Sequence, residues 1–295
     1  MVTWNDVKDD PKAIKCLDHG FVVLLDSMGD DSTIVQSARV SYGKGTKKIS
    51  DDRRLIRYLL RHQHTTPFEM VEFRFLMKLP IFVARQLIRH RTASVNEYSG
   101  RYSEMPNEFY IPELEDLAPQ SATNHQGRSG DMADSLATAA QFYIDDHSKG
   151  AFACYQALLG NDDTHRVPID GGIAKELARM VLPLNNYTEW YWKIDLKNLM
   201  HFLKLREDSH AQKEIQVFAN AIHDLIAPSI PLAMEAFRDY WQEAHTFSRM
   251  ETELLQKMVN LALSNIPSSE VSEWIAEAGL TAREVMDFKK KIMLD

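Results

Sequence analysis

The stretch MVEFRFLMKLPIFVARQLIRHRTASVNEYSGRYSE, residues 70–104, contains the change of period that decides the fold. Apolar and polar residues largely alternate over 70–79, which predicts a half-buried strand that Pro80 ends. Helical spacing follows from residue 81 to about 89, and the polar segment Thr92–Pro106 predicts a loop. The stretch therefore predicts a strand that passes directly into a helix.

Periodic patterns on both sides predict further elements of both kinds. Helices are expected near residues 51–63, in the segment ending at Leu159, near 173–181 and 196–203, and from the capping box at 209–212 to Pro228, where Ile215, Phe218, Ile222 and Leu225 form the apolar face; another strand is expected over 188–194. The tetrapeptides Ser209–Gln212 and Thr281–Glu284 have the form of capping boxes, which begin helices. Residues 113–135 are rich in turn formers and predict a surface excursion without chemistry of its own.

These elements predict an α+β fold. No internal repeat and no Gly-rich linker interrupts the pattern. We therefore expect a single main domain of mixed helices and strands over residues 1–249 and a helical C-terminal extension over residues 250–295.

The composition argues against several classes of protein. The formal net charge of −8 disfavours nucleic acid as a partner, because duplex binding needs many Lys and Arg side chains. The polar, acidic first residues and the lack of a long apolar run argue against secretion and against a membrane partner. Cys16 and Cys154 show no disulfide or zinc-ligand spacing, which fits a cytoplasmic protein.

One segment is strongly basic within this acidic chain. Arg85, Arg89, Arg91 and Arg101 accompany one acid, Glu97, giving a local charge of +3. The planar guanidinium group donates paired hydrogen bonds to phosphates, so the cluster indicates an anion site. Cations at the C-terminal end of a helix also complement its dipole, and composition alone leaves both interpretations open.

The string RQLIRHRTASVNEYSGRYSE, residues 85–104, resembles the signature of the flavin-dependent thymidylate synthases: Arg-His-Arg, a seven-residue spacer and then Ser. Further blocks resemble that family in the same order: ARVSYG at 38–43, HTTPFE at 64–69, ARMVLPL at 178–184 and LREDSHAQ at 205–212. The resemblance covers about residues 18–245 and leaves 113–135 and the tail without a role.

The resemblance implies a binding site for dUMP. The residues that match the family's set are Gln86, Arg89, Ser99, Gly100, Arg101, Arg179 and Arg206. Arg179 is expected to contact the phosphate from another subunit. Arg206 is expected beside the uracil ring as the catalytic residue, since a cation there stabilises negative charge on the pyrimidine. Ser99 is given no covalent role.

The resemblance also implies an FAD site. The matching residues are Ser41, His64, Thr66, Arg89, His90, Arg91, Asn96, Glu97, Asp195, His201, Leu205 and His210. Asp195, Lys197 and His201 depart from the family, in which many members carry Asn, Arg and Asn there. No GxGxxG sequence is present, so the implied fold is the family's own and not a Rossmann fold.

The implied reaction is the reductive methylation of dUMP to dTMP. Methylenetetrahydrofolate, a folate co-substrate, donates the carbon, and FAD reduced by NADPH supplies the hydride. The resemblance implies a homotetramer with active sites at subunit interfaces, and no metal. It also implies that no cysteine adds to the uracil ring.

Two other classes of function remain alternatives from the residues alone. A metal-dependent hydrolase could use His62, His64, Glu69 and His90 as ligands. A nucleotide- or RNA-binding module could use the arginine cluster together with aromatic side chains such as Tyr98 and Tyr102.

Overall fold

The computed structural model describes residues 1–40, 49–122, 127–161, 167–263 and 268–291. The chain divides into two compact units, Met1–Gln242 and Glu243–Asp295, here called the main unit and the C-terminal unit. The boundary predicted after residue 249 lies a few residues inside the second unit and stays a prediction.

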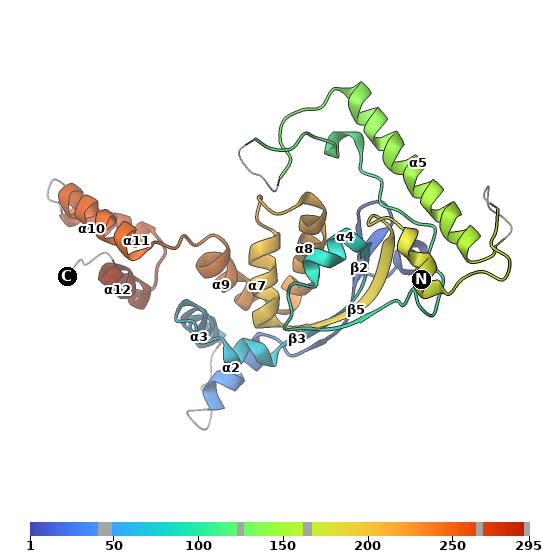
Figure 1. The fold of residues 1–295 in the computed structure, drawn as a ribbon. Coiled ribbons are helices and arrows are strands. Elements are labelled where there is room, and N and C mark those ends of the chain that lie inside the picture. The colour runs from blue at the N-terminus through green and yellow to red at the C-terminus, as the bar shows by residue number, and fades with distance from the viewer. Residues whose placement is uncertain (41–48, 123–126, 162–166, 264–267, 292–295) are drawn as a thin grey trace. The chain divides into compact units, whose positions relative to one another are not determined.

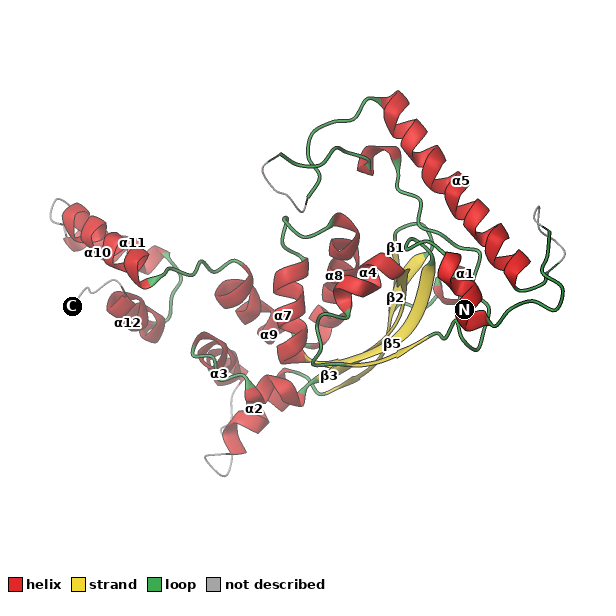
Figure 2. Ribbon diagram, viewed as in Figure 1, coloured by secondary structure: helices red, strands yellow, loops and turns green. Residues whose placement is uncertain are grey.

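A five-stranded antiparallel sheet in the order β1-β2-β3-β5-β4 is the framework of the main unit (Figures 1 and 2). Its strands are β1 (Ala13–Cys16), β2 (Gly20–Met28), β3 (Glu72–Pro80), β4 (Ser94–Glu97) and β5 (Tyr187–Asp195). Together with the helices, this sheet confirms the predicted α+β fold.

The central pair β3 and β5 is in register along its whole length, from Glu72 opposite Asp195 to Pro80 opposite Tyr187. The predicted alternation is present at the start of β3, where Phe73 and Phe75 are buried and Arg74 between them is exposed. It is wrong from Phe75 onward, because Leu76 and Lys78 on the predicted polar face are also buried, Leu76 against the N-terminal residues Val2, Trp4 and Val7. The structure confirms the strands expected over 70–79 and 188–194.

Helices α4 (Ile81–Leu87), α7 (Leu196–Arg206) and α8 (Lys213–Ile226) cover one face of the sheet (Figure 1). Pro80 is both the last residue of β3 and the N-cap of α4, so the strand passes directly into the helix as predicted. The buried faces of these helices and of the sheet form one large apolar core.

The other helices of the main unit surround this framework. They are α1 (Trp4–Val7), α2 (Asp31–Arg39), α3 (Ile49–Arg61), α5 (Asp134–Leu158), α6 (Lys175–Ala178) and α9 (Pro231–Phe237). Short 3₁₀ turns occur at Thr66–Met70, Leu114–Asp116, Arg179–Val181 and Ala227–Ser229, and a π-helical turn at Arg238–Gln242. Among the described residues, no helix has the length and apolar composition needed to cross a membrane.

The predicted loop over Thr92–Pro106 is wrong in part. Residues Ser94–Glu97 form β4, the edge strand that pairs with β5. All four side chains of β4 are exposed, so no buried apolar pattern marks the strand in the sequence. Its backbone hydrogen bonds to β5 hold it in place instead.

The predicted capping box at Ser209–Gln212 is also wrong. Helix α8 begins at Lys213 with Gln212 as its N-cap, and the Gln212 side chain makes no capping bond. The predicted apolar face is correct, since Ile215, Phe218 and Ile222 are fully buried.

The C-terminal unit contains α10 (Arg249–Leu263), α11 (Ser268–Glu277) and α12 (Ala282–Lys291). Here the predicted capping box is present. The backbone N–H of Thr281 donates to Oε2 of Glu284 at 2.8 Å, and the N–H of Glu284 donates to Oγ1 of Thr281 at 3.3 Å.

Candidate active site

The end of α4 carries the first candidate residues. Arg89 and His90 follow the helix in a tight turn, with their backbone N–H groups bonded to the carbonyls of Gln86 and Leu87. The Gln86 side-chain amide donates to Oε1 of Gln212, just before α8. Sequence blocks that lie far apart thus meet at one place, and Gln212 is a neighbour that the sequence did not identify as part of the site.

Arg206 and His90 are in direct contact. Arg206 Nε donates to His90 Nε2 at 3.1 Å, so this ring nitrogen accepts and the histidine is neutral. Burial, then the charge of Arg206 and the nearby His201, lowers the pKa of His90 to about 4. Burial also lowers the pKa of Arg206 from its ordinary value. His90 therefore orients the guanidinium group that is predicted to be catalytic.

These two residues line a pocket of about 380 Å³, here called the His90 pocket. Its lining residues are Arg89, His90, Arg91, Thr92, Ile194, Asn198, His201, Leu205 and Arg206. Within the described residues neither Arg89 nor Arg91 forms an ion pair. Three arginines in one pocket without a carboxylate beside them fit an anionic ligand.

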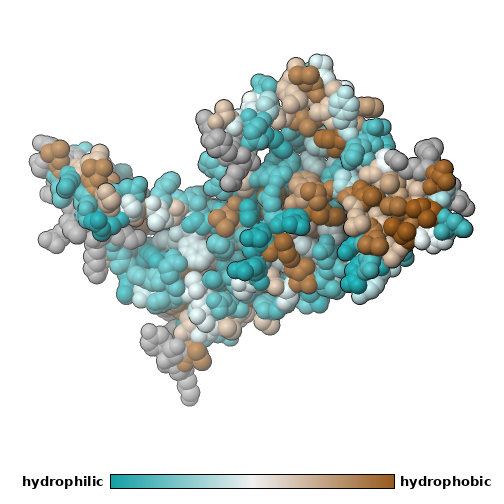
Figure 3. All heavy atoms as spheres, in the orientation of Figure 1, coloured by the Kyte–Doolittle hydropathy of each residue, from teal (hydrophilic) through white to brown (hydrophobic). Residues whose placement is uncertain are grey.

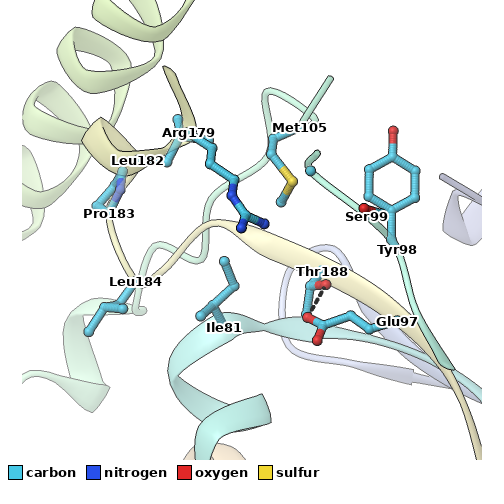
Figure 4. Close-up of a pocket in the computed structure, with 11 residues that line it drawn as sticks. Ile81, Glu97, Tyr98, Ser99, Met105, Arg179, Leu182, Pro183, Leu184 and Thr188 are labelled. Atoms are coloured by element: carbon cyan, nitrogen blue, oxygen red, sulfur yellow. Dashed lines mark hydrogen bonds between the residues drawn. The ribbon is translucent and has the colours of Figure 1, made fainter. Parts of the chain in front are cut away.

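A second pocket of about 330 Å³ lies at the other end of β4 and is here called the Ser99 pocket (Figure 4). Its lining residues are Ile81, Glu97, Tyr98, Ser99, Gly100, Met105, Arg179, Leu182, Pro183, Leu184 and Thr188. The Arg179 guanidinium points into it (Figure 4), and in the described part of the chain it has no ion-pair partner. Arg179 thus joins Ser99 and Gly100 within one chain, and its contact with the phosphate of dUMP bound to another subunit stays a prediction.

Gly100 packs closely against two side chains. A Cβ there would lie 2.8 Å from Sδ of Met105 and 3.3 Å from Cδ of Arg179. The absence of a side chain thus lets the backbone approach both residues. Met105 is a wall of this pocket that the sequence did not identify.

Glu97 is held by a residue from the neighbouring strand. The Thr188 hydroxyl, buried on β5, donates to Oε1 of Glu97 at 2.7 Å (Figure 4). The antiparallel pairing of β4 with β5 brings the two side chains together. Thr188 was expected only as a strand residue, and nothing in the sequence marked its contact with Glu97.

The other predicted residues that the structure describes lie outside the two pockets. Arg101 pairs with Glu176 at 3.2 Å, and both side chains are about half exposed. His64 and Thr66 are exposed in the turn after α3, and His210 is exposed and bonded to Asp208 at 2.8 Å. Asn96 is exposed on β4. Ser41 lies outside the described residues.

Asp195 has a structural partner. It is the N-cap of α7, and its carboxylate accepts hydrogen bonds from the Asn198 backbone at 2.9 Å and from the Asn198 side chain at 2.7 Å. His201 and Leu205 line the His90 pocket, and Asn198 joins them there. Of the residues that depart from the family pattern, Asp195 thus caps a helix and His201 lines the His90 pocket.

The metal-site alternative gains no support. Among the described residues, no three or more His, Cys, Asp and Glu side chains gather in a way that could hold an ion. His90 Nε2 already accepts from Arg206.

Comparisons with known proteins point to one family. The model of the thymidylate synthase complementing protein family matches residues 23–232. Relatives named flavin-dependent thymidylate synthase include one from Rickettsia bellii (strain RML369-C), 52% identical over 250 residues, 84% of this chain and 85% of the relative. Another, from Ruegeria pomeroyi, is 47% identical over 281 residues, 95% of this chain and 88% of the relative.

Solved structures agree as well. The crystal structure of a UMP/dUMP methylase, PolB from Streptomyces cacaoi bound with 5-Br dUMP, matches with a TM-score of 0.67 and 33% sequence identity. The match covers 78% of this chain and 99% of that chain.

Proposed function

The chain belongs to the flavin-dependent thymidylate synthase family, and from that premise we propose that it converts dUMP to dTMP with methylenetetrahydrofolate as carbon donor and NADPH-reduced FAD as hydride source. The observation that carries the proposal is the pair formed by Arg206 and neutral His90 in a pocket with two further arginines. Such a pocket suits a ligand on which negative charge is present or develops.

Five of the seven residues proposed for dUMP fall into two groups within one chain, whereas Gln86 and Arg101 line neither pocket. Ser99, Gly100 and Arg179 line the Ser99 pocket, whereas Arg89 and Arg206 line the His90 pocket. The two pockets share no lining residue. We infer that a complete site combines the Ser99 pocket of one subunit with the His90 pocket of another, in the homotetramer that the resemblance implies.

Exposed apolar side chains support such an assembly. Val167, Met180 and Leu184 expose 90%, 73% and 63% of their surface. Leu184 lines the Ser99 pocket, Met180 follows Arg179, and Val167 lies in the segment between α5 and α6. Figure 3 shows apolar surface gathered around the C-terminal end of α5 and the segment after it. Patches of this kind mark surfaces that a partner covers, and a second copy of the chain is the proposed partner.

In the proposed mechanism the protein positions substrates and tunes charge. Arg206, oriented by His90, stabilises negative charge on the uracil ring as its C5 becomes nucleophilic. Arg179 holds the dUMP phosphate, and Arg89, His90 and Arg91, which line the His90 pocket, would hold FAD beside dUMP. Reduced FAD, when bound, supplies the hydride.

A cysteine nucleophile has no part in this mechanism. Cys16 is fully buried, and burial raises the pKa of its thiol, which opposes formation of a thiolate. Cys154 lies on α5 and lines neither pocket.

The test is dTMP formation by the purified protein from dUMP and methylenetetrahydrofolate, with FAD and NADPH each present or omitted. Product that requires both supports the proposal. A folded, flavin-loaded protein that makes no dTMP under any of these conditions overturns it. Replacing NADPH by NADH in the same assay determines which nicotinamide cofactor is preferred.

A further inference from the structure

The polar segment between the Ser99 pocket and α5, which the proposed reaction leaves without a role, is tied to the rest of the main unit. We call its described parts, residues 110–122 and 127–131, the strap. A short antiparallel bridge joins Gln120 to Arg128, with Ser121 N–H bonded to the Gly127 carbonyl at 2.9 Å and Ser129 N–H to the Pro119 carbonyl at 3.1 Å. Arg128 therefore has a defined position in the strap.

Arg128 reaches a buried carboxylate on α8. Its Nη1 lies 2.9 Å from Oε1 of Glu214, a residue of which 2% is exposed. The Tyr110 hydroxyl, also in the strap, donates to the same oxygen at 3.3 Å. A buried carboxylate left without a cationic partner is strongly unfavourable, so this contact fixes the strap and the helix against each other.

A second ion pair repeats the connection one residue earlier on the helix. Lys213 Nζ pairs with Asp116 of the strap, and Arg128 Nη2 lies 3.8 Å from the same Asp116 carboxylate. Lys213 and Glu214, the residues through which the strap contacts α8, are the first two residues of this helix. The strap thus holds the first turn of this helix from outside.

That turn is connected to the proposed dUMP site. Gln212, the N-cap that precedes Lys213, has no capping bond to its own helix, and its side-chain oxygen accepts from the amide of Gln86. A continuous series of contacts runs from Arg128 through Glu214 and the first turn of α8 to Gln212 and Gln86. The position of the Gln86 amide depends on where α8 begins.

We propose that Arg128 is a positioning residue for dUMP: through Glu214 it fixes the start of α8 and, through Gln212, the side chain of Gln86. This inference rests on the proposed function, because it assigns dUMP to the site of Gln86. Arg128 acts through other residues and touches no substrate.

The decisive variants separate positioning from stability. Arg128→Met leaves Glu214 as an uncompensated buried charge, so it both destabilises the protein and releases the first turn of α8. Arg128→Met combined with Glu214→Gln removes the charge as well, which restores much of the stability but not the connection. Arg128→Lys keeps a cation in place, and Arg74→Met, which removes an exposed pair with Asp26, is the matched control.

The measurements are the Kd of dUMP by calorimetry, KM and kcat on the flavin-loaded protein, and the free energy of unfolding in urea. Arg128→Met and the double variant are both expected to weaken dUMP binding about tenfold, the effect of one misplaced hydrogen bond, with a smaller change in kcat. Arg128→Lys is expected to recover most of the affinity, and Arg74→Met to change nothing.

The outcomes distinguish the possibilities. If dUMP affinity returns to the wild-type value in the double variant as stability recovers, Arg128 is only structural and the inference is wrong. Wild-type affinity in a folded Arg128→Met protein also overturns it. If the wild-type protein binds no dUMP, the proposed function itself fails, whatever the variants do.

Discussion

The Ser99 pocket and the His90 pocket are similar in volume but are built differently. The Ser99 pocket is formed by a loop whose glycine is enclosed between Met105 and Arg179, with apolar walls such as Leu182 and Leu184. The His90 pocket lies where α4 and α7 end, and three arginines, Asn198 and two histidines dominate its lining.

The difference indicates a division of tasks between the pockets. In the Ser99 pocket, close packing around Gly100 fixes the position of the loop, and we expect shape to select the ligand there. In the His90 pocket, charge acts on the ligand, and burial keeps the histidine neutral so that it can accept from Arg206. We expect variants of the His90 pocket to change the rate and variants of the Ser99 pocket to change the affinity.

The largest effect is expected from Arg206→Ala. Removing a preorganised charge that stabilises the transition state lowers kcat by roughly 10²–10³-fold. Steady-state kinetics at saturating dUMP measure this, with Arg206→Lys as a variant that keeps the charge but loses the Nε contact with His90. A kcat within a few-fold of wild type would remove Arg206 from the catalytic role.

Gly100→Ala is expected to have the next largest effect, which is a weaker affinity for dUMP. A methyl group there displaces the side chains of Met105 and Arg179, which line the pocket, and we expect roughly 5- to 100-fold weaker binding of dUMP as a result. Calorimetry with dUMP measures the change. The double variant Gly100→Ala with Met105→Ala makes room and should recover part of the affinity; no recovery would mean that the side chain of Met105 does not set the shape of the pocket.

A smaller effect concerns the pH dependence of stability. The unfolded chain protonates His90 near pH 6.5 and the folded protein only near pH 4, so the free energy of unfolding falls as the pH is lowered through this window. His90→Gln, which keeps an acceptor for Arg206, should remove that part of the loss. Urea unfolding at several pH values between 7 and 4 measures it.

His223 provides the matched comparison because its pKa is shifted in the opposite direction, upward, on folding. Its hydrogen bond to Glu207 raises the pKa of His223, so its stabilisation is present below the unfolded pKa and is lost as the pH rises through the folded pKa. His223→Gln should therefore make stability fall more steeply on acidification. The same response from both variants would contradict the assignment.

The smallest effect is expected from replacing both Cys16 and Cys154 by Ala. Neither thiol lines either pocket, and the buried Cys16 is held as a thiol. Turnover should remain close to wild type in the dTMP assay. Loss of turnover in a folded double variant, judged by circular dichroism and bound flavin, would require a cysteine in the chemistry and would contradict the proposed mechanism.

Prediction from the sequence succeeded where a pattern is local. The strands β3 and β5, the alternation of β5 and the helical faces of α7 and α8 follow from the period of buried residues, and the structure confirms them. The edge strand β4 was not predicted, because its exposed side chains carry no such period. At the start of α8, local sequence indicated a capping box, whereas the helix begins later, where the strap holds its first turn.

The sequence by itself determined the α+β class, the strand that passes into α4, and the family to which the candidate residues belong. Only the tertiary structure decided which of those residues meet. It brought Arg206 against His90, Arg179 beside Gly100, and Thr188 onto Glu97. The physical reason is that periodicity records only whether a side chain faces the core, whereas these contacts join segments far apart in the chain, which come together through sheet pairing and helix packing.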